Sequence, residues 1–261
     1  MIFDTHCHLQ FKGFKDEYGD VLKRCQEKDV ALNIVGTQKD TSRAAVEMAE
    51  KSSNVYATIG LHPVHLFPTH IDEEESSFLS REEDFDEKFY RDLAQSSKVV
   101  GIGECGLDFY HLPEGIDKKV VFAKQKSVFL KQLKLAEELK KTLVIHVRDA
   151  HKEMIELLEE NTQPNSLQAV VHCYTGNWSD AKEYLDLGFY IGFTGVITFP
   201  AKKLNPQPTL DILEVVEKTP LEKIVIETDA PYLAPQAYRG QKCEPWMFLT
   251  TNNAQKLFHL G

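Results

Sequence analysis

Short β-branched segments alternate with longer amphipathic segments along the chain, and this alternation constrains the fold more than any other feature. Strands that alternate with helices build a parallel sheet, and eight of them at this spacing favour closure into a (β/α)8 barrel. A doubly wound open sheet is the alternative. The eight strand-like segments span residues 2–6, 31–37, 55–63, 98–104, 142–148, 168–174, 189–195 and 223–229.

The segments between these strands have the period of helices. The region from Pro63 to Lys98 is long and acidic, and we expect it to hold the third helix and a loop. Only 32 residues follow Asp229, so the C-terminal helical region is short, with a last helix expected at 249–260. No linker divides the chain, which predicts one α/β domain over residues 1–261. The other expected helices span 18–28, 40–51, 119–140, 149–161, 179–187 and 209–217.

Composition and charge exclude several classes of protein. No apolar run approaches the ~20 residues of a membrane span, and Asp4 and His6 stand too near the start for a signal peptide. The five cysteines are scattered without a CxxC pair, which indicates a reducing compartment. We therefore expect a cytoplasmic protein with no membrane association and no obligate protein partner. The net charge of −10 argues against a general nucleic-acid coat, but acidic residues between Asp72 and Asp92 supply most of it.

Polar residues follow the strands at the ends that meet at one mouth of a parallel barrel, where the active sites of this fold lie. Histidine and carboxylate side chains bind divalent cations such as zinc and manganese. A single histidine at a strand end is usually a hydrogen-bonded structural residue. Burying this many ionisable groups together without a cation would be costly, so the set predicts a metal centre. Its members are His6, His8, His146, His172, Glu104 and Asp229, with His62 at the same mouth.

Four histidines and two carboxylates exceed the needs of one tetrahedral site, so two cations are expected. Glu104 is the expected bridge because its strand lies centrally among the others. One cation would take His6, His8, Glu104 and Asp229, and the other Glu104, His146 and His172. Such a pair activates a bound water as a nucleophile and stabilises the attacking and leaving oxygens of a hydrolysis. Asp229 is the candidate general base.

Strand alternation assigns the residues next to these candidates to one or the other face of their strands. Asp4 shares a side of its strand with His6 but lies deeper, so we expect it to support a ligand without ligating. By the same alternation, Cys7, Cys105 and Cys173 are expected to face away from the mouth and to pack against helices.

These residues lie in segments that together resemble the TatD family of metal-dependent deoxyribonucleases, within the amidohydrolase-like superfamily. The resemblance implies a (β/α)8 barrel that hydrolyses DNA phosphodiester bonds, commonly as a 3′–5′ exonuclease on single strands or 3′ ends. It also implies two divalent cations (Mg, Zn or Mn), and His62, Arg148 and Arg239 facing the substrate. The planar fork of arginine suits phosphate. The matching segments are DTHCHL (4–9), GLHP (60–63), GIGECGLDFY (101–110), HVRDA (146–150), HCYTG (172–176), ETDAPYL (227–233) and RGQKCEP (239–245).

The chain departs from the family pattern in its last segments. Cys243 stands where the family usually has asparagine, and the helical segments that usually follow Pro245 are missing. This shortening should thin the outer wall beside the eighth strand. Two other functions fit the barrel. One is an amidohydrolase that cleaves a small ester, lactone or amide, although such enzymes often bridge two metals with a carboxylated lysine and none stands among these ligands. The other is a non-catalytic binding module, which would not need the complete ligand set.

Overall fold

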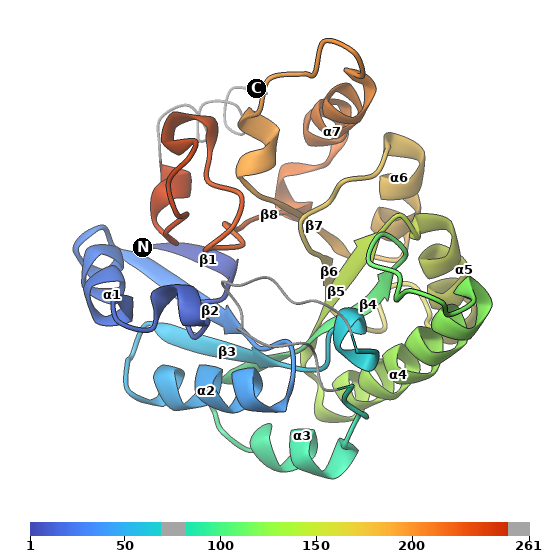
Figure 1. The fold of residues 1–261 in the computed structure, drawn as a ribbon, viewed down its shortest axis with the longest axis horizontal. Helices are drawn as coiled ribbons and strands as arrows, with labels where there is room; N and C mark the ends of the chain where they lie inside the picture. Colours follow the sequence, from blue (N-terminus) through green and yellow to red (C-terminus); the bar gives the residue numbers. More distant parts are fainter. Residues whose placement is uncertain (69–81, 250–261) are drawn as a thin grey trace.

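The computed structural model describes residues 1–68 and 82–249 of the chain. Its eight strands form one parallel sheet in sequence order, and they stand in a ring at the centre of the molecule with the helices outside (Figure 1). The predicted (β/α)8 barrel is therefore confirmed. The strands are β1 (Ile2–Cys7), β2 (Val30–Val35), β3 (Val55–Ile59), β4 (Val99–Asp108), β5 (Thr142–Arg148), β6 (Ala169–Val171), β7 (Tyr190–Phe193) and β8 (Ile224–Ile226).

The helices fall between the strands close to the predicted ranges. A third helix lies within the acidic region, as expected, whereas the helix predicted at 249–260 falls almost wholly outside the described residues. Up to residue 249, only short 3-10 turns follow β8. The helices are α1 (Tyr18–Glu27), α2 (Lys39–Glu50), α3 (Glu87–Leu93), α4 (Lys118–Leu139), α5 (His151–Asn161), α6 (Trp178–Asp186) and α7 (Gln207–Lys218).

Strands β1 and β8 meet through a buried carboxylate. Asp4 is fully buried, and its Oδ1 accepts the backbone N–H of Thr228 at 3.0 Å while its Oδ2 accepts the Thr228 hydroxyl at 2.6 Å. The Oδ1 atom also accepts the backbone N–H of His6 at 3.2 Å. One residue beyond, the N–H of Asp229 donates to the carbonyl of His6 at 2.9 Å. These bonds hold the segment after β8 beside the histidine pair of β1.

Strand β8 is less deeply buried than β2. Every residue of β2 is buried, whereas all three residues of β8 are only half-buried. The segment after β8 instead returns to α1 and β1 (Figure 1), where Arg24 donates to both carboxylate oxygens of Glu244 at 2.7 and 3.0 Å. Cys243, at the position where asparagine was expected, is buried, and its N–H donates to the carbonyl of Pro231 at 2.9 Å.

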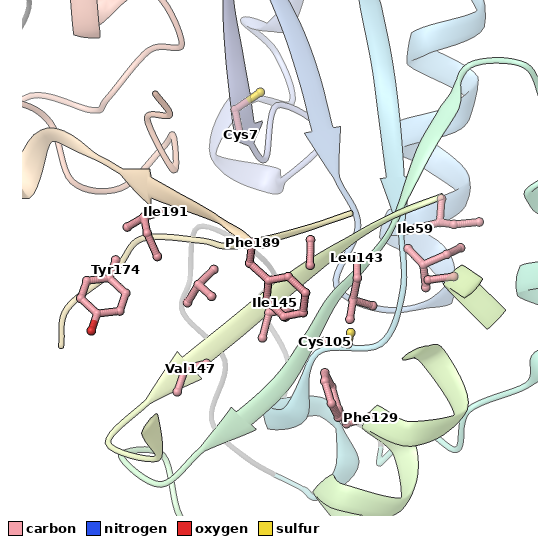
Figure 2. Close-up of a cluster of buried hydrophobic side chains, with 14 of the residues drawn as sticks. Cys7, Ile59, Cys105, Phe129, Leu143, Ile145, Val147, Tyr174, Phe189 and Ile191 are labelled. Atoms are coloured by element: carbon pink, nitrogen blue, oxygen red, sulfur yellow. The ribbon is translucent and has the colours of Figure 1, made fainter. Parts of the chain in front are cut away.

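The outer faces of the strands and the inner faces of the helices form the hydrophobic core (Figure 2). Cys7 and Cys105 are fully buried in it, as strand alternation predicts. Two glutamines of α4 cross this layer to reach strand ends. Gln132 bonds both backbone groups of Leu61, and Gln125 bonds both backbone groups of Asp108. Helix α4 thereby fixes the segments that carry side chains into the mouth.

Candidate metal centre

A pocket of about 400 Å³ opens at the end of the barrel where the strands terminate at their carboxyl ends. The predicted ligand set comes to this mouth from five separate segments of the chain. His6 and His8 come from β1 and the residue after it, Glu104 from β4, and His146 from β5. His172 and Asp229 follow β6 and β8. All except His6, which lies beneath the others, line the pocket.

Glu104 lies at the centre of this group, and its Oε2 faces the histidines of β1. The Nε2 atoms of His6 and His8 lie 3.3 and 3.8 Å from Oε2. The same two nitrogens lie 3.8 and 3.2 Å from Oδ1 of Asp229. Two imidazoles and two carboxylates therefore surround one point on this side of Glu104.

The other oxygen of Glu104 faces a second set of histidines. His146 Nδ1 lies 2.8 Å from Oε1, His172 Nε2 lies 3.3 Å away, and His62 Nε2 lies 3.4 Å away. The two oxygens of one buried carboxylate thus divide the histidines into two groups. His62, which the resemblance places against substrate, touches Glu104 in the same way as the two expected ligands.

The charges in the centre are strongly coupled. Burial would raise the pKa of Glu104, but the surrounding histidines, led by His172 and His62, bring it well below its usual range. Burial lowers the pKa of His146, but Asp108 and Glu104 outweigh this and raise it to about 9. Burial and the neighbouring His146 instead lower the pKa of His62 to about 4. Glu104 is therefore ionised at neutral pH and attracts positive charge.

The donor atoms fit divalent cations. Ligand atoms of His6, His8 and Glu104 lie within 4.8 Å of one another, and so do those of His62, Glu104 and His146. Imidazole nitrogen and carboxylate oxygen are the mixed donor set that zinc and manganese accept.

A family model described as TatD related DNase matches residues 3–259, which is nearly the whole chain. The chain belongs to the TatD family of metal-dependent hydrolases. Among curated TatD-type relatives, "Uncharacterized metal-dependent hydrolase YabD" of Bacillus subtilis is 32% identical, with all of both chains covered. The protein named "3'-5' ssDNA/RNA exonuclease TatD" of Yersinia pseudotuberculosis is 35% identical over 90% of this chain and 81% of its own.

A solved TatD-family structure shares the fold. The crystal structure of YjjV, a TatD homologue from Escherichia coli K12, has a TM-score of 0.74 and 26% identity, covering 99% of this chain and 95% of the other. In the described part of this TatD-family chain, no helix combines the length and apolar character of a membrane span.

Two further carboxylates of the TatD-family site escaped the sequence reasoning. Asp108 is buried, and its Oδ2 lies 3.2 Å from Nε2 of His146, opposite the nitrogen that faces Glu104. Glu227 is also buried, and its Oε1 lies 3.2 Å from Nδ1 of His172, although the two are not aligned as a hydrogen bond. Each histidine that faces Oε1 of Glu104 from β5 or β6 therefore has a carboxylate behind it.

The spacing of residues in the sequence could have identified both of these carboxylates. Asp108 lies four residues after Glu104, and Glu227 two before Asp229, so an even spacing relates each to a candidate on the same strand or its extension. Carboxylates behind metal-binding histidines hold the ring orientation and the tautomer.

The predicted substrate-facing residues lie in different places. Arg148 lines the pocket at its rim. Arg239 is not among the lining residues, and its guanidinium stacks 4.4 Å from the ring of Phe199. The expectation that Cys173 packs away from the mouth is wrong, because it is half-buried and lines the pocket. Strand β6 ends at Val171, so alternation no longer applies at Cys173, where φ is +45°.

Proposed function

We propose that the chain is a two-metal nuclease that cleaves the phosphodiester bonds of single-stranded DNA or RNA, acting from the 3′ end. The observation that carries this proposal is the division of the histidines between the two oxygens of Glu104. A bridging carboxylate between two cations is suited to phosphoryl transfer, in which both the attacking and the leaving oxygen need charge stabilisation. The name of the Yersinia relative supports the polarity and the substrate.

Residues of the chain would divide into two metal-binding sets. His6, His8 and Asp229 would hold one cation on the Oε2 side of Glu104. When bound, the cations would supply positive charge that acidifies water and neutralises the phosphate oxygens. His146 and His172 would hold the second cation on the Oε1 side, and His62 is a third donor there.

Asp229 is the proposed proton acceptor. Burial would raise its pKa, but the hydrogen bond with His8 and the nearby His172 lower it below its usual value. It is therefore ionised at neutral pH, and it lines the pocket with a side chain 17% exposed. A water held between Asp229 and a phosphate would pass its proton to a carboxylate oxygen of Asp229 as the new P–O bond forms and the P–O bond to the leaving nucleotide breaks. Arg148 at the rim would hold a neighbouring phosphate through its guanidinium.

The test is release of nucleotides from end-labelled single-stranded DNA and RNA after metal removal and return of Mg²⁺, Mn²⁺ or Zn²⁺. Comparing 3′-blocked with 5′-blocked substrates reports the polarity. Glu104→Ala and Asp229→Ala should abolish release, whereas Asp186→Ala, a surface change on α6 with a side chain 60% exposed, should not. Metal-loaded protein that releases no nucleotide would refute the proposal. Faster turnover of small esters than of nucleic acid would favour the amidohydrolase alternative.

A further inference from the structure

An exposed tyrosine stands at the edge of the catalytic mouth. Tyr110 follows β4 by two residues and is 61% exposed, among the most exposed aromatic side chains in residues 1–68 and 82–249. Its two neighbours in sequence have different environments: Phe109 is buried, and His111 lines the pocket. An aromatic ring in this place is in contact with water in the free protein, so burial in the core does not explain it.

The backbone that carries this ring is held firmly. Oδ1 of Asp108 accepts the N–H groups of Tyr110 and His111, each at 2.8 Å. Oδ2 of the same carboxylate lies 2.7 Å from Nδ1 of His111 and 3.2 Å from Nε2 of His146. One buried carboxylate therefore ties the exposed ring to a proposed metal ligand. The backbone that presents the ring therefore has a fixed position relative to the proposed metal-binding residues, as a binding surface requires.

The guanidinium group of an arginine lies against the ring of Tyr110. The guanidinium carbon of Arg148 lies 4.8 Å from the centroid of Tyr110, and Arg148 is exposed and lines the pocket. Within the described ranges, no carboxylate lies within 4.0 Å of this guanidinium. Among the described residues the cation is therefore not neutralised by an ion pair, and it stands at the rim of the pocket that the proposed metal-binding residues line.

We propose that Tyr110 and Arg148 form a nucleotide platform, on which a base stacks against Tyr110 and the adjoining phosphate binds Arg148. This inference rests on the proposed nuclease function and specifies how it recognises its substrate. Aromatic rings paired with arginine bind single strands of any sequence, because every base has a π-face. Bases inside a duplex are already stacked and cannot occupy the ring, so the platform selects single-stranded ends.

The experiment compares the wild type with Tyr110→Ala and Tyr110→Trp on a short single-stranded oligonucleotide and on bis(2,2,2-trifluoroethyl) phosphate, a small diester that has neither a base nor any other aromatic ring. Loss of one stacked base should lower kcat/KM of Tyr110→Ala on the oligonucleotide by roughly 5- to 150-fold, mainly through KM. Turnover of the small diester should stay within about twofold, and Tyr110→Trp should retain activity on the oligonucleotide because it keeps a stacking face.

A matched control is Tyr190→Ala, which removes a tyrosine under Lys223 at the opposite end of the barrel, 4.7 Å from the ring centroid. Its activity per folded molecule should equal the wild type on both substrates. A series of oligonucleotides with one abasic site then locates the contact. An abasic site at the stacked position should reduce wild-type activity by the same factor as Tyr110→Ala, and it should reduce the activity of that variant no further.

Two results would overturn the platform while leaving the nuclease proposal intact. One is an equal loss on both substrates, which would mean that Tyr110 supports only the metal centre. The other is an abasic penalty that is the same in wild type and Tyr110→Ala. A wild type that turns over the small diester but neither binds nor cleaves the oligonucleotide would instead overturn the nuclease proposal, and the platform with it.

Discussion

Replacing Asp108 by asparagine should weaken the binding of one cation and leave the other unchanged. The carboxylate accepts N–H groups on both oxygens, from the backbone of Tyr110 and His111 on Oδ1 and from the His111 and His146 rings on Oδ2. An amide has one oxygen, so its NH₂ group must face donors on one of these sides. If the NH₂ group faces His146, Nε2 of the ring must accept a hydrogen bond from it. The neutral ring then carries its hydrogen on Nδ1, the atom that points at Glu104.

The size of the effect follows from two opposing contributions. Loss of a carboxylate behind a metal-binding histidine weakens metal binding by about 10- to 100-fold. The second contribution has the opposite sign. Because the pKa of His146 is raised to about 9, a cation must displace a proton from this ring at pH 7 in the wild type, and this competition weakens the apparent metal affinity by roughly 100-fold. Asp108→Asn lowers that pKa and relieves the competition. The deficit should therefore be larger at pH 8.5 than at pH 7.

The assay is a two-step titration of metal-free protein with Mn²⁺ at both pH values. Asp186→Asn on the outer surface is the matched carboxylate-to-amide control. Only one binding step should change, because the contacts of Asp108 reach His146 and none reaches His6 or His8. An equal loss in both steps, or a deficit that does not depend on pH, would refute the tautomer argument.

Four further predictions test other parts of the structure. Because the pKa values of His146 and His172 are raised, metal binding at pH 7 should release protons from these rings. Calorimetry in buffers of different ionisation enthalpy measures this release, and finding none would contradict the raised pKa values. By the same sign, protonated His146 stabilises the metal-free protein fully below about pH 6.5, and this contribution disappears as pH rises through its pKa of about 9. Asp4→Ala leaves the buried donors of Thr228 unpaired and should therefore lower the free energy of unfolding by about 2–4 kcal/mol. Urea titrations measure this, and a decrease of less than about 0.5 kcal/mol would show that these hydrogen bonds are dispensable. Gly106→Ala places a methyl carbon 1.9 Å from the carbonyl oxygen of His146 and should lose more than about 3 kcal/mol; wild-type melting would contradict the close strand approach.

The gathering of the candidate ligands at one mouth was predictable because a parallel barrel collects its strand ends there. His6 and Asp229 are more than 200 residues apart, yet each follows a strand-like segment, and that alone places them together. The supporting carboxylates were harder to predict. Strand β4 runs on to Asp108, although the predicted strand-like segment, residues 98–104, ends at Glu104. Glycine continues the strand here because φ at Gly106 is +156° and the backbone of β5 leaves no room for a side chain.

The register between β4 and β5 explains why these features occur together. It pairs Gly106 with His146, so His146 lies midway between Glu104 and Asp108 on the neighbouring strand. Each ring nitrogen consequently faces one carboxylate, and the one that faces Glu104 is left for a metal. The same register pairs Asp108 with Arg148, which brings the guanidinium to the segment that carries the exposed tyrosine. A slip of one residue would turn these side chains to the opposite face and separate all of these contacts at once. The spacing E-C-G-L-D therefore constrains the metal ligand, its tautomer and the proposed substrate platform through a single strand pairing.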